Sequence, residues 1–368
     1  MKRIRYGRIA ALVAAGALAL TACGNDPVPA SDSGGGGGSE QQSDLSGELN
    51  GAGATSQEAA QNAWKSGFGS QNPDVTVNYD PVGSGGGRTQ FGEGAVDFAG
   101  SDAAMDDEER AAAKERCGSE AIHLPLYISP IAIVYHLDGV DSLQLSPATV
   151  AGIFDRKITK WNDPKIAADN PGAKLPSSGI TPVNRSDESG TTTNFTQWMA
   201  ATAGGAWPHE PSGDWPLKGG QSAQGTSGLV QTVQGGQGTI GYADHSQAGD
   251  LGVAKIKVGD AYVEPTAEGA AKVVEESPKA EGVPEHDLAI DIKRDTTTAG
   301  AYPLLLVSYL IVCEKYADSA KGDMAKAYMS YIASDAGQKA AADAAGSAPI
   351  SDKLRTEVEA SINSISAG

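Results

Sequence analysis

Hydrophobic and polar residues alternate along this chain with two periods, one typical of helices and the other of strands. Apolar residues recur at helical spacing in segments that are predicted to be helices, namely 57–66, 106–116, 147–154, 191–201, 222–234, 319–333 and 352–365. Alternating or continuous apolar runs between them predict strands at 75–79, 124–137 and 240–242, and a hairpin of 255–258 with 261–264. This succession predicts an α/β fold with largely parallel sheets.

The first residues, 1–23, are typical of a secretion signal. A short apolar stretch at 9–20 is too short to span a bilayer, and cations precede it. These cations are Lys2, Arg3, Arg5 and Arg8. No later segment is long and apolar enough to span a membrane, because 302–313 has only the length of a strand or of a single buried element.

The signal ends in Leu-Thr-Ala-Cys-Gly at 20–24, which resembles the bacterial lipobox. That pattern predicts cleavage before Cys23 and acylation of this cysteine; an ordinary signal peptide with an incidental cysteine is the alternative. Residues 24–46 contain prolines and a glycine run but few apolar residues, so they predict a flexible tether. The chain is thus expected on the outer face of the cell membrane, held by a lipid anchor.

The rest of the chain, roughly 320 residues, can form two domains. Removing the four signal cations lowers the formal charge from −18 to −22, which argues against nucleic acid as a partner. Two further cysteines, Cys117 and Cys313, suggest one disulfide in an exported protein, with two buried free thiols as the alternative. There is no CxxC or HExxH motif and the histidines are scattered, so no metal site or other cofactor is predicted.

The segment 184–195, Asn-Arg-Ser-Asp-Glu-Ser-Gly-Thr-Thr-Thr-Asn-Phe, carries the chemistry of a site for a small tetrahedral oxyanion. Arg185 offers a planar fork of donors, and Asp187 can hold it in one orientation. Ser189 is a predicted helix N-cap, Gly190 allows close approach, and the helix start aims free N–H groups at a ligand. The alternative is an exposed capped helix with a surface ion pair.

Two small-residue segments resemble helix starts of the same kind. Thr55 and Ser56 lie at the end of Gly-Ala-Gly-Ala-Thr-Ser, directly before a predicted helix. Ser84 lies in Gly-Ser-Gly-Gly-Gly-Arg at 83–88, which matches neither the dinucleotide nor the nucleoside triphosphate motif. A plain loop is the usual meaning of one such run, but repeated hydroxyl-bearing helix starts favour an anion site.

Asp102 follows the strand-like stretch 96–101, where a ligand could lie. A carboxylate repels an anion unless the anion carries a proton that it can donate, as hydrogen phosphate does and sulfate does not. An unpaired buried acceptor costs about 1–3 kcal/mol, and sites built around one hydrogen bond can reject analogues that lack it by about 10⁴–10⁵. Asp102 therefore favours phosphate over sulfate; its alternative role is the N-cap of the helix near Asp106.

These motifs, in this order, resemble those of the phosphate-binding proteins of bacterial ABC phosphate importers. The segment 153–164 also resembles that family, and the resemblance covers about residues 47–350. With the lipobox and the acidic composition, the chain is similar to the lipoprotein form of Gram-positive actinobacteria.

The resemblance implies a two-lobed periplasmic-binding-protein fold of type II, with a hinge and a central cleft. Lobe I would comprise 47–137 and 299–368, and lobe II 138–298, which puts both cysteines in one lobe. The implied function is a monomeric, non-enzymatic receptor that binds inorganic phosphate and delivers it to ABC permease subunits. The implied ligand-binding residues are Thr55, Ser56, Ser84, Asp102, Arg185, Ser189, Gly190 and Thr191, with Asp187 supporting Arg185.

The chain departs from the family pattern at three positions. Ser56 stands where an aromatic residue is common, Gly85 replaces a frequent second serine, and Glu188 stands where glycine is common. Glu188 adds a negative charge close to Arg185. These changes bear on affinity more than on ligand class.

Three other functions fit the motifs less well. A phosphate-ester hydrolase could use Ser84 or Ser189 as nucleophile, but it would need a base or metal ions beside the serine. A receptor for sulfate, molybdate or phosphonate is the second, and an adhesive lipoprotein with a relic site is the third. Trp207 and Trp215 lie in a Pro/Gly-rich segment that either packs internally or touches the permease.

Overall fold

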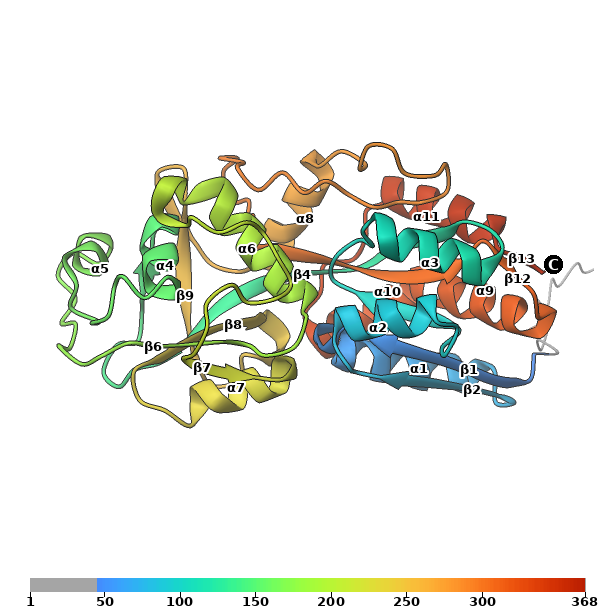
Figure 1. Cartoon of the computed structure of the whole chain (residues 1–368), viewed down its shortest axis with the longest axis horizontal. Coiled ribbons are helices and arrows are strands. Elements are labelled where there is room, and N and C mark those ends of the chain that lie inside the picture. The colour runs from blue at the N-terminus through green and yellow to red at the C-terminus, as the bar shows by residue number, and fades with distance from the viewer. Residues whose placement is uncertain (1–44, 368) are drawn as a thin grey trace, which may run out of the picture. The chain divides into compact units, whose positions relative to one another are not determined.

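The computed structural model of the protein describes residues 45–367 (Figure 1). The predicted signal at 1–23, with Cys23, and all but the end of the tether predicted at 24–46 lie outside the described residues. Among residues 45–367, none of the helices combines the length and the apolar character that crossing a bilayer requires.

Helices and strands alternate along most of the described chain. The α-helices are α1 (Glu58–Gln71), α2 (Ser84–Gly92), α3 (Asp107–Cys117), α4 (Pro147–Phe154), α5 (Pro164–Asp169), α6 (Gly190–Thr202), α7 (Gly225–Gln234), α8 (Ala267–Glu276), α9 (Ser319–Ala333), α10 (Asp335–Ala345) and α11 (Asp352–Ser364). Short 3₁₀ helices are η1 (Thr55–Gln57), η2 (Gly204–Ala206) and η3 (His245–Gln247). The strands are β1 (Gly47–Gly53), β2 (Val75–Asp80), β3 (Phe98–Ser101), β4 (Ala121–His136), β5 (Gln144–Leu145), β6 (Thr181–Arg185), β7 (Gln221–Ala223), β8 (Thr239–Asp244), β9 (Gly252–Val258), β10 (Ala261–Val263), β11 (Leu305–Cys313), β12 (Lys315–Tyr316) and β13 (Ser366–Ala367).

Most elements predicted from the sequence coincide with observed ones. The helices predicted at 147–154 and 319–333 are α4 and α9 with the same bounds, and β9 and β10 form the predicted hairpin. The prediction missed four helices: α2, which is rich in glycine, α10, which consists mainly of alanine, the short α5, and α8. The small residues of α2 and α10 mark only a weak apolar face, so the periodicity that reveals a helix is faint there. Helix α8 does bury an apolar face with Val273 and Val274, and its omission was an error in interpreting the sequence.

The main sheet has two parts that share strand β4 (Figure 1). Its strand order is β2-β1-β3-β11-β4-β8-β6-β7, and β9 also pairs with β4. Strand β4 pairs with β11 up to Pro130 and with β8 from Ile131 onward. We call β1, β2, β3, β11 and residues 121–130 of β4 the first lobe, with the helices packed on them. The second lobe comprises β5 to β10 and residues 131–136 of β4, so the expected two-lobed α/β fold is confirmed.

The expectation of largely parallel sheets is only partly correct. Strand β1 is parallel to β2 and β3, and β6 is parallel to β7 and β8. At the centre, however, β11 is antiparallel to β3 and β4, and β4 is antiparallel to β8. The centre is antiparallel because the chain passes from the first lobe to the second along β4 and returns along β11.

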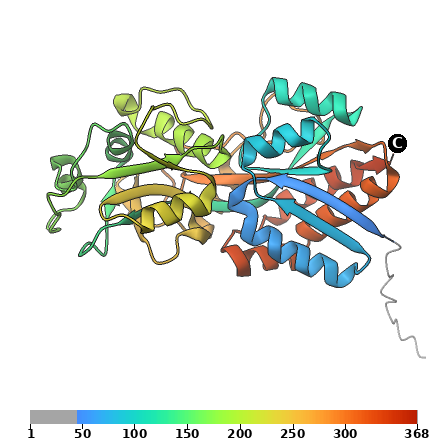
Figure 2. The same ribbon diagram turned by 60° about the horizontal axis from the view of Figure 1, so that its bottom comes forward.

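Helices cover both faces of the first-lobe strands. In Figure 2, α1 lies on one side of β1 and β2, and α2 and α3 lie on the other. Helix α1 packs against α10 and α9, whereas α2 packs against α3, β1 and β3. The C-terminal ends of the parallel strands β1 and β3 thus lead into segments at one edge of the sheet, where ligands of open α/β folds bind.

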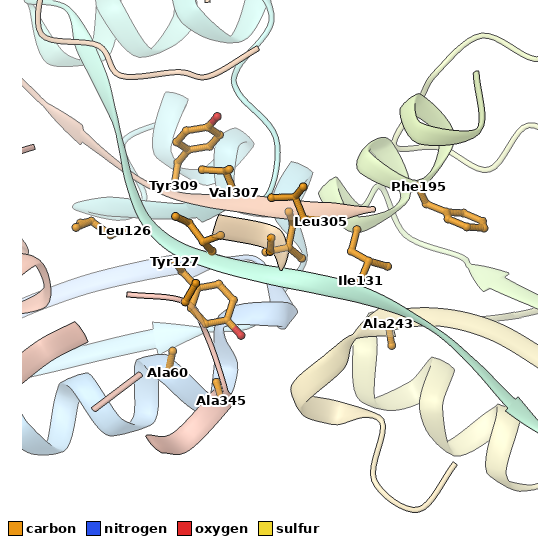
Figure 3. Close-up of a cluster of buried hydrophobic side chains, with 14 of the residues drawn as sticks. Ala60, Leu126, Tyr127, Ile131, Phe195, Ala243, Leu305, Val307, Tyr309 and Ala345 are labelled. Carbon is orange, nitrogen blue, oxygen red and sulfur yellow. The ribbon is translucent and has the colours of Figure 1, made fainter. Parts of the chain in front are cut away.

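A hydrophobic core passes through the junction of the lobes (Figure 3). Tyr127 and Ile131 on β4 and Leu305 on β11 are almost completely buried there. Phe195 on α6 and Ala243 on β8 continue the cluster into the second lobe. Because burial of each large apolar side chain contributes about 1.5–3 kcal/mol, the junction is a packed part of the fold and not a loose linker.

The chain returns from α8 to β11 through an irregular segment, residues 277–304. Its Asp287 is fully buried and accepts from Nδ1 of His123 on β4 (2.9 Å) and from Arg110 on α3. Burial would raise the pKa of Asp287, but the hydrogen bonds and charges of His123 and Arg110 outweigh it and lower the pKa to about 2. This carboxylate anchors the return segment on the first lobe.

We propose that the lobes divide at Pro130–Ile131 in β4 and at Leu304–Leu305 before β11, instead of near 137 and 298. The neighbours of β4 in the sheet change at the first point, and β11 begins at the second. The N–H of Ile131 donates to the carbonyl of Leu304 (2.9 Å), so the two crossing points are hydrogen-bonded to each other.

The predicted disulfide is present. Cys117 at the end of α3 and Cys313 at the end of β11 have Cα atoms 5.5 Å apart and are separated by 196 positions. Both elements belong to the first lobe as defined above, so the bond ties distant parts of the chain within that lobe.

Replacing both cysteines with alanine is expected to lower the free energy of unfolding by up to ~5 kcal/mol, because the bond closes a long loop in the unfolded chain. Urea unfolding followed by circular dichroism measures the change. The wild-type protein in reductant should show the same shift, and the alanine variant should show none on adding reductant. Equal midpoints for the oxidised wild type and the variant would contradict the prediction.

Candidate functional site

Asp102, at the end of β3, is the centre of a buried group of hydroxyls. Its Oδ1 accepts from Ser56 (2.6 Å) and from Ser308 on β11 (2.6 Å), and its Oδ2 accepts from Thr191 on α6 (2.8 Å). Asp102 is only 3% exposed. A carboxylate has about four lone-pair positions, so these three donors leave one position on Oδ2. Helix α3 is capped by Asp106, with a capping box to Glu109, so the alternative role of Asp102 as that cap is wrong.

Arg185, at the end of β6, is held by Asp187. Its Nε donates to Oδ1 of Asp187 (2.8 Å), and its Nη2 donates to Oδ2. The N–H of Gly225 also donates to Oδ1 of Asp187 (3.1 Å), which fixes the carboxylate from its other side. The Arg185 side chain is only 3% exposed. Asp187 takes one edge of the guanidinium, so the outer edge retains N–H donors for another acceptor.

Ser189 is the N-cap of α6, as predicted. Its Oγ accepts from the N–H of Thr192 (3.3 Å), and Gly190 is the first residue of the helix. A side chain at Gly190 would place Cβ 2.6 Å from Oγ of Ser84 and 2.8 Å from Cβ of Asp102. Gly190 is therefore required for close approach of α6 to the first lobe.

Ser84 begins α2, and its Oγ accepts from the N–H of Asp102 (3.2 Å). Gly83, just before it, has a φ of +99° that favours glycine, and a Cβ there would lie 2.7 Å from Oδ2 of Asp187. The start of α2 therefore lies between Asp102 on one side and the Arg185–Asp187 pair on the other. All the residues predicted for the site gather in this region.

Thr55 contacts the second lobe through Thr226, a residue that the sequence analysis missed. The two hydroxyls are 2.9 Å apart, and the N–H of Thr226 donates to Oγ1 of Thr55 (3.0 Å). Gln247 in η3 donates to the carbonyl of Thr55 (2.9 Å). Thr226 follows Gly225 at the start of α7 in a Gly-Thr pair like that of Gly190-Thr191, and this repeated pair was the available signal.

Ser308 and Asn194 also belong to the site and were missed. Ser308 is a lone hydroxyl inside the apolar run of β11, and Asn194 on α6 donates to the carbonyl of Asp102 (2.7 Å). Both are recognisable only when β11 and α6 are brought beside β3. Together with the Thr55–Thr226 and Asp102–Thr191 bonds, the bond from Asn194 joins the two lobes directly, so the structure has the closed arrangement.

Four helix starts carry the site residues: η1, α2, α6 and α7. The first N–H groups of a helix have no partner within it and carry a partial positive charge. The overall charge of the protein is negative, so these helix ends, with Arg185, supply the local positive field.

An aromatic stack lies behind Arg185. The hydroxyl of Tyr242 accepts from the N–H of Arg185 (3.3 Å) and lies 2.7 Å from Oγ1 of Thr192. Its ring stacks on Phe195 (centroids 4.3 Å apart) and on Trp215 (6.0 Å), and burial raises its pKa to about 12. Trp215, which is half-buried, packs in turn against Trp207, which is 4% exposed, so Trp207 packs internally.

Within residues 45–367, no group of three or more His, Cys, Asp or Glu side chains could hold a metal ion. The donors gathered at the site are hydroxyls, backbone N–H groups and a guanidinium, and they suit an oxyanion. The remaining acceptor position on Asp102 suits an oxyanion that carries a proton.

Comparison with known proteins agrees with this arrangement. The family model described as "PBP superfamily domain" matches residues 38–336. Phosphate-binding protein PstS 3 of Mycobacterium tuberculosis is 36% identical over 377 residues, which cover 99% of this chain and 100% of the relative. PstS 2 of the same organism is 36% identical over 376 residues, with 100% of both chains covered. Both relatives are named as binding proteins and not as enzymes.

A solved structure shares the fold. It is a high-affinity periplasmic phosphate-binding protein bound with phosphate, with a TM-score of 0.69 and 22% sequence identity, covering 85% of this chain and 93% of that chain. The sequence relatives extend over the full length and include every segment that forms the site. This protein therefore belongs to the PBP superfamily and, within it, to the family of PstS phosphate-binding proteins.

Proposed function

We propose that this protein is a receptor that binds inorganic phosphate between its two lobes and delivers it to an ABC permease. The observation that carries the proposal is the buried Asp102, which keeps one acceptor position beside the start of α2 while Arg185 offers donors on the other side of that start. The names of the relatives support phosphate as the ligand.

The proton of the ligand explains why Asp102 can lie in an anion site. Hydrogen phosphate can donate a proton to the free position on Oδ2 of Asp102, whereas sulfate would place an unprotonated oxygen against it. The other oxygens of the anion would accept from Arg185 and from the starts of η1, α2, α6 and α7. We propose Thr55, Ser56, Ser84, Ser189, Gly190 and Thr191 as the residues that supply these donors.

We further propose that the protein works outside the cell, anchored through acylated Cys23 and the tether at 24–46. A lipid anchor with a flexible tether keeps a monomeric receptor close to the permease subunits. Binding favours the closed lobes, and the permease recognises that form.

A role in ester hydrolysis is not proposed. The hydroxyl of Ser189 caps α6, and that of Ser84 accepts from the N–H of Asp102. In the described chain, neither hydroxyl has a hydrogen bond to a histidine that could act as base.

Calorimetric titration of the chain from residue 24 onward, freed of bound anion, tests the receptor proposal. We expect tight one-to-one binding of phosphate and no measurable binding of sulfate near neutral pH. A folded, anion-free protein that gives no heat with phosphate would refute the proposal. Steady release of nitrophenol from p-nitrophenyl phosphate would instead favour a hydrolase.

A further inference from the structure

Glu188 and Arg88 form an ion pair between the lobes. Arg88 lies on α2 of the first lobe, and its Nη2 donates to Oε1 of Glu188 (3.2 Å), which lies in the loop before α6 of the second lobe. Arg88 is 7% exposed and is also bound by Glu109 (2.8 Å) and Ser101 (2.9 Å) of its own lobe. Of the hydrogen bonds that Arg88 makes, separation of the lobes would therefore break only the one to Glu188.

The carboxylate of Glu188 occupies a space that two glycines leave open. A Cβ on Gly85 would lie 1.9 Å from its Oε2, and a Cβ on Gly213 would lie 2.0 Å from its Oε1. Oε2 is buried and accepts no hydrogen bond from the described residues. Gly85 is in the first turn of α2, where the helix dipole favours a negative charge.

Glu188 and Gly85 are thus complementary in space across the two lobes. A serine at 85 would overlap Glu188, and a glycine at 188 would leave Arg88 without its partner across the lobes.

We propose that Glu188, Arg88 and Gly85 are positioning residues that hold the lobes closed and slow the release of phosphate. This inference rests on the proposed function. The ion pair forms only when α2 and the 186–189 loop meet, so it stabilises the closed form alone, and Gly85 provides the space that the pair requires.

The charge of the pair is tested with Glu188→Gln, which keeps the shape of the side chain. The Arg88 side chain is buried and that of Glu188 is 32% exposed, so the pair is partly shielded from solvent. Because loss of one partner of such a pair acts mainly on dissociation, we expect phosphate release in stopped-flow measurements to become about three- to tenfold faster. Arg88→Gln in the Glu188→Gln background should add less than about twofold. Glu93→Gln, an exposed carboxylate after the end of the same helix, is the matched control and should leave release unchanged. Unchanged or slower release from Glu188→Gln would overturn the proposal.

The need for open space at Gly85 beside the Glu188 carboxylate is tested with Gly85→Ser. In the wild-type background, overlap should displace the partly exposed carboxylate of Glu188 from Arg88 and weaken phosphate binding by about fivefold. In the Glu188→Gly background, the same serine should change affinity by less than about twofold relative to Glu188→Gly alone. An equal loss in both backgrounds would refute the complementary role of Gly85.

A measurement without ligand separates this inference from the proposed function. If the wild type fails to bind phosphate, the receptor proposal fails. The role of the ion pair in closing the lobes is then tested by small-angle X-ray scattering of the anion-free proteins. Glu188→Gln should then show a larger radius of gyration than wild type and Glu93→Gln. Equal radii would overturn the role of the pair in closure.

Discussion

Replacing Arg185 with methionine is expected to weaken phosphate binding by about 10²–10⁴-fold. Arg185 is buried, and Asp187 aligns it by two hydrogen bonds. The substitution removes the donors to the anion and also leaves Asp187, whose side chain is 12% exposed, without its partner. Removing one partner of a buried, hydrogen-bonded charge pair between two binding partners costs about 2–5 kcal/mol, and each 1.4 kcal/mol is about tenfold in affinity.

Calorimetric titration with phosphate measures this loss, and the thermal midpoint shows whether the variant is folded. Arg355→Met is the matched control, because Arg355 also pairs with one carboxylate, Asp335, but lies on α11 away from the site. Arg185→Lys should recover only part of the affinity, since lysine keeps the charge but lacks the planar fork. Binding by folded Arg185→Met within about fivefold of wild type would contradict the assignment of Arg185 as the anion clamp.

Asp102→Asn is expected to change which anion the protein prefers. The asparagine amide presents an N–H donor where Asp102 presents an acceptor, so the proton of hydrogen phosphate loses its partner and an unprotonated sulfate oxygen gains one. Sites built around one hydrogen bond discriminate by about 10⁴–10⁵. We expect the ratio of phosphate to sulfate affinity to fall by at least about 10²-fold, through weaker phosphate binding and measurable sulfate binding.

Competition titrations with both anions measure this ratio. Asp244→Asn is the control, because Asp244 is also fully buried, at the end of β8, but is bonded to Tyr127 and Ser246 and not to the site hydroxyls. Burial raises the pKa of Asp244 to about 6, so a neutral side chain there is a mild change near that pH. An unchanged anion preference in Asp102→Asn would refute the proposal that Asp102 selects phosphate by accepting its proton.

The part of the site that the sequence predicted depends on local chemistry. The Arg185–Asp187 pair, the Ser189 cap and Gly190 lie in one short segment, and their roles follow from neighbours within a few positions. Thr226 and Ser308 were missed because their roles depend on residues that are far away in the chain. Thr226 bonds to Thr55, 171 positions earlier, and Ser308 bonds to Asp102, 206 positions earlier. No periodicity within a segment carries this information.

The fold shows the same division. Helices α4 and α9 were predicted with their observed bounds, but α8 and the antiparallel centre of the sheet were missed. The direction of β11 is set by its return from the second lobe, which is a property of the whole chain path. The lobe boundaries also remain a proposal, because one strand, β4, takes part in both lobes.

The position of β11 has a consequence for the order in which the protein can fold. This strand comes from residues 305–313 but lies between β3 and β4, which end by residue 136. A chain that is synthesised from its N-terminus cannot complete the sheet of the first lobe until β11, which ends at Cys313, has also emerged. Contacts this distant in sequence slow folding and leave strand edges open meanwhile. The architecture therefore favours a chain that stays unfolded until its synthesis is nearly complete, as a polypeptide threaded across a membrane must.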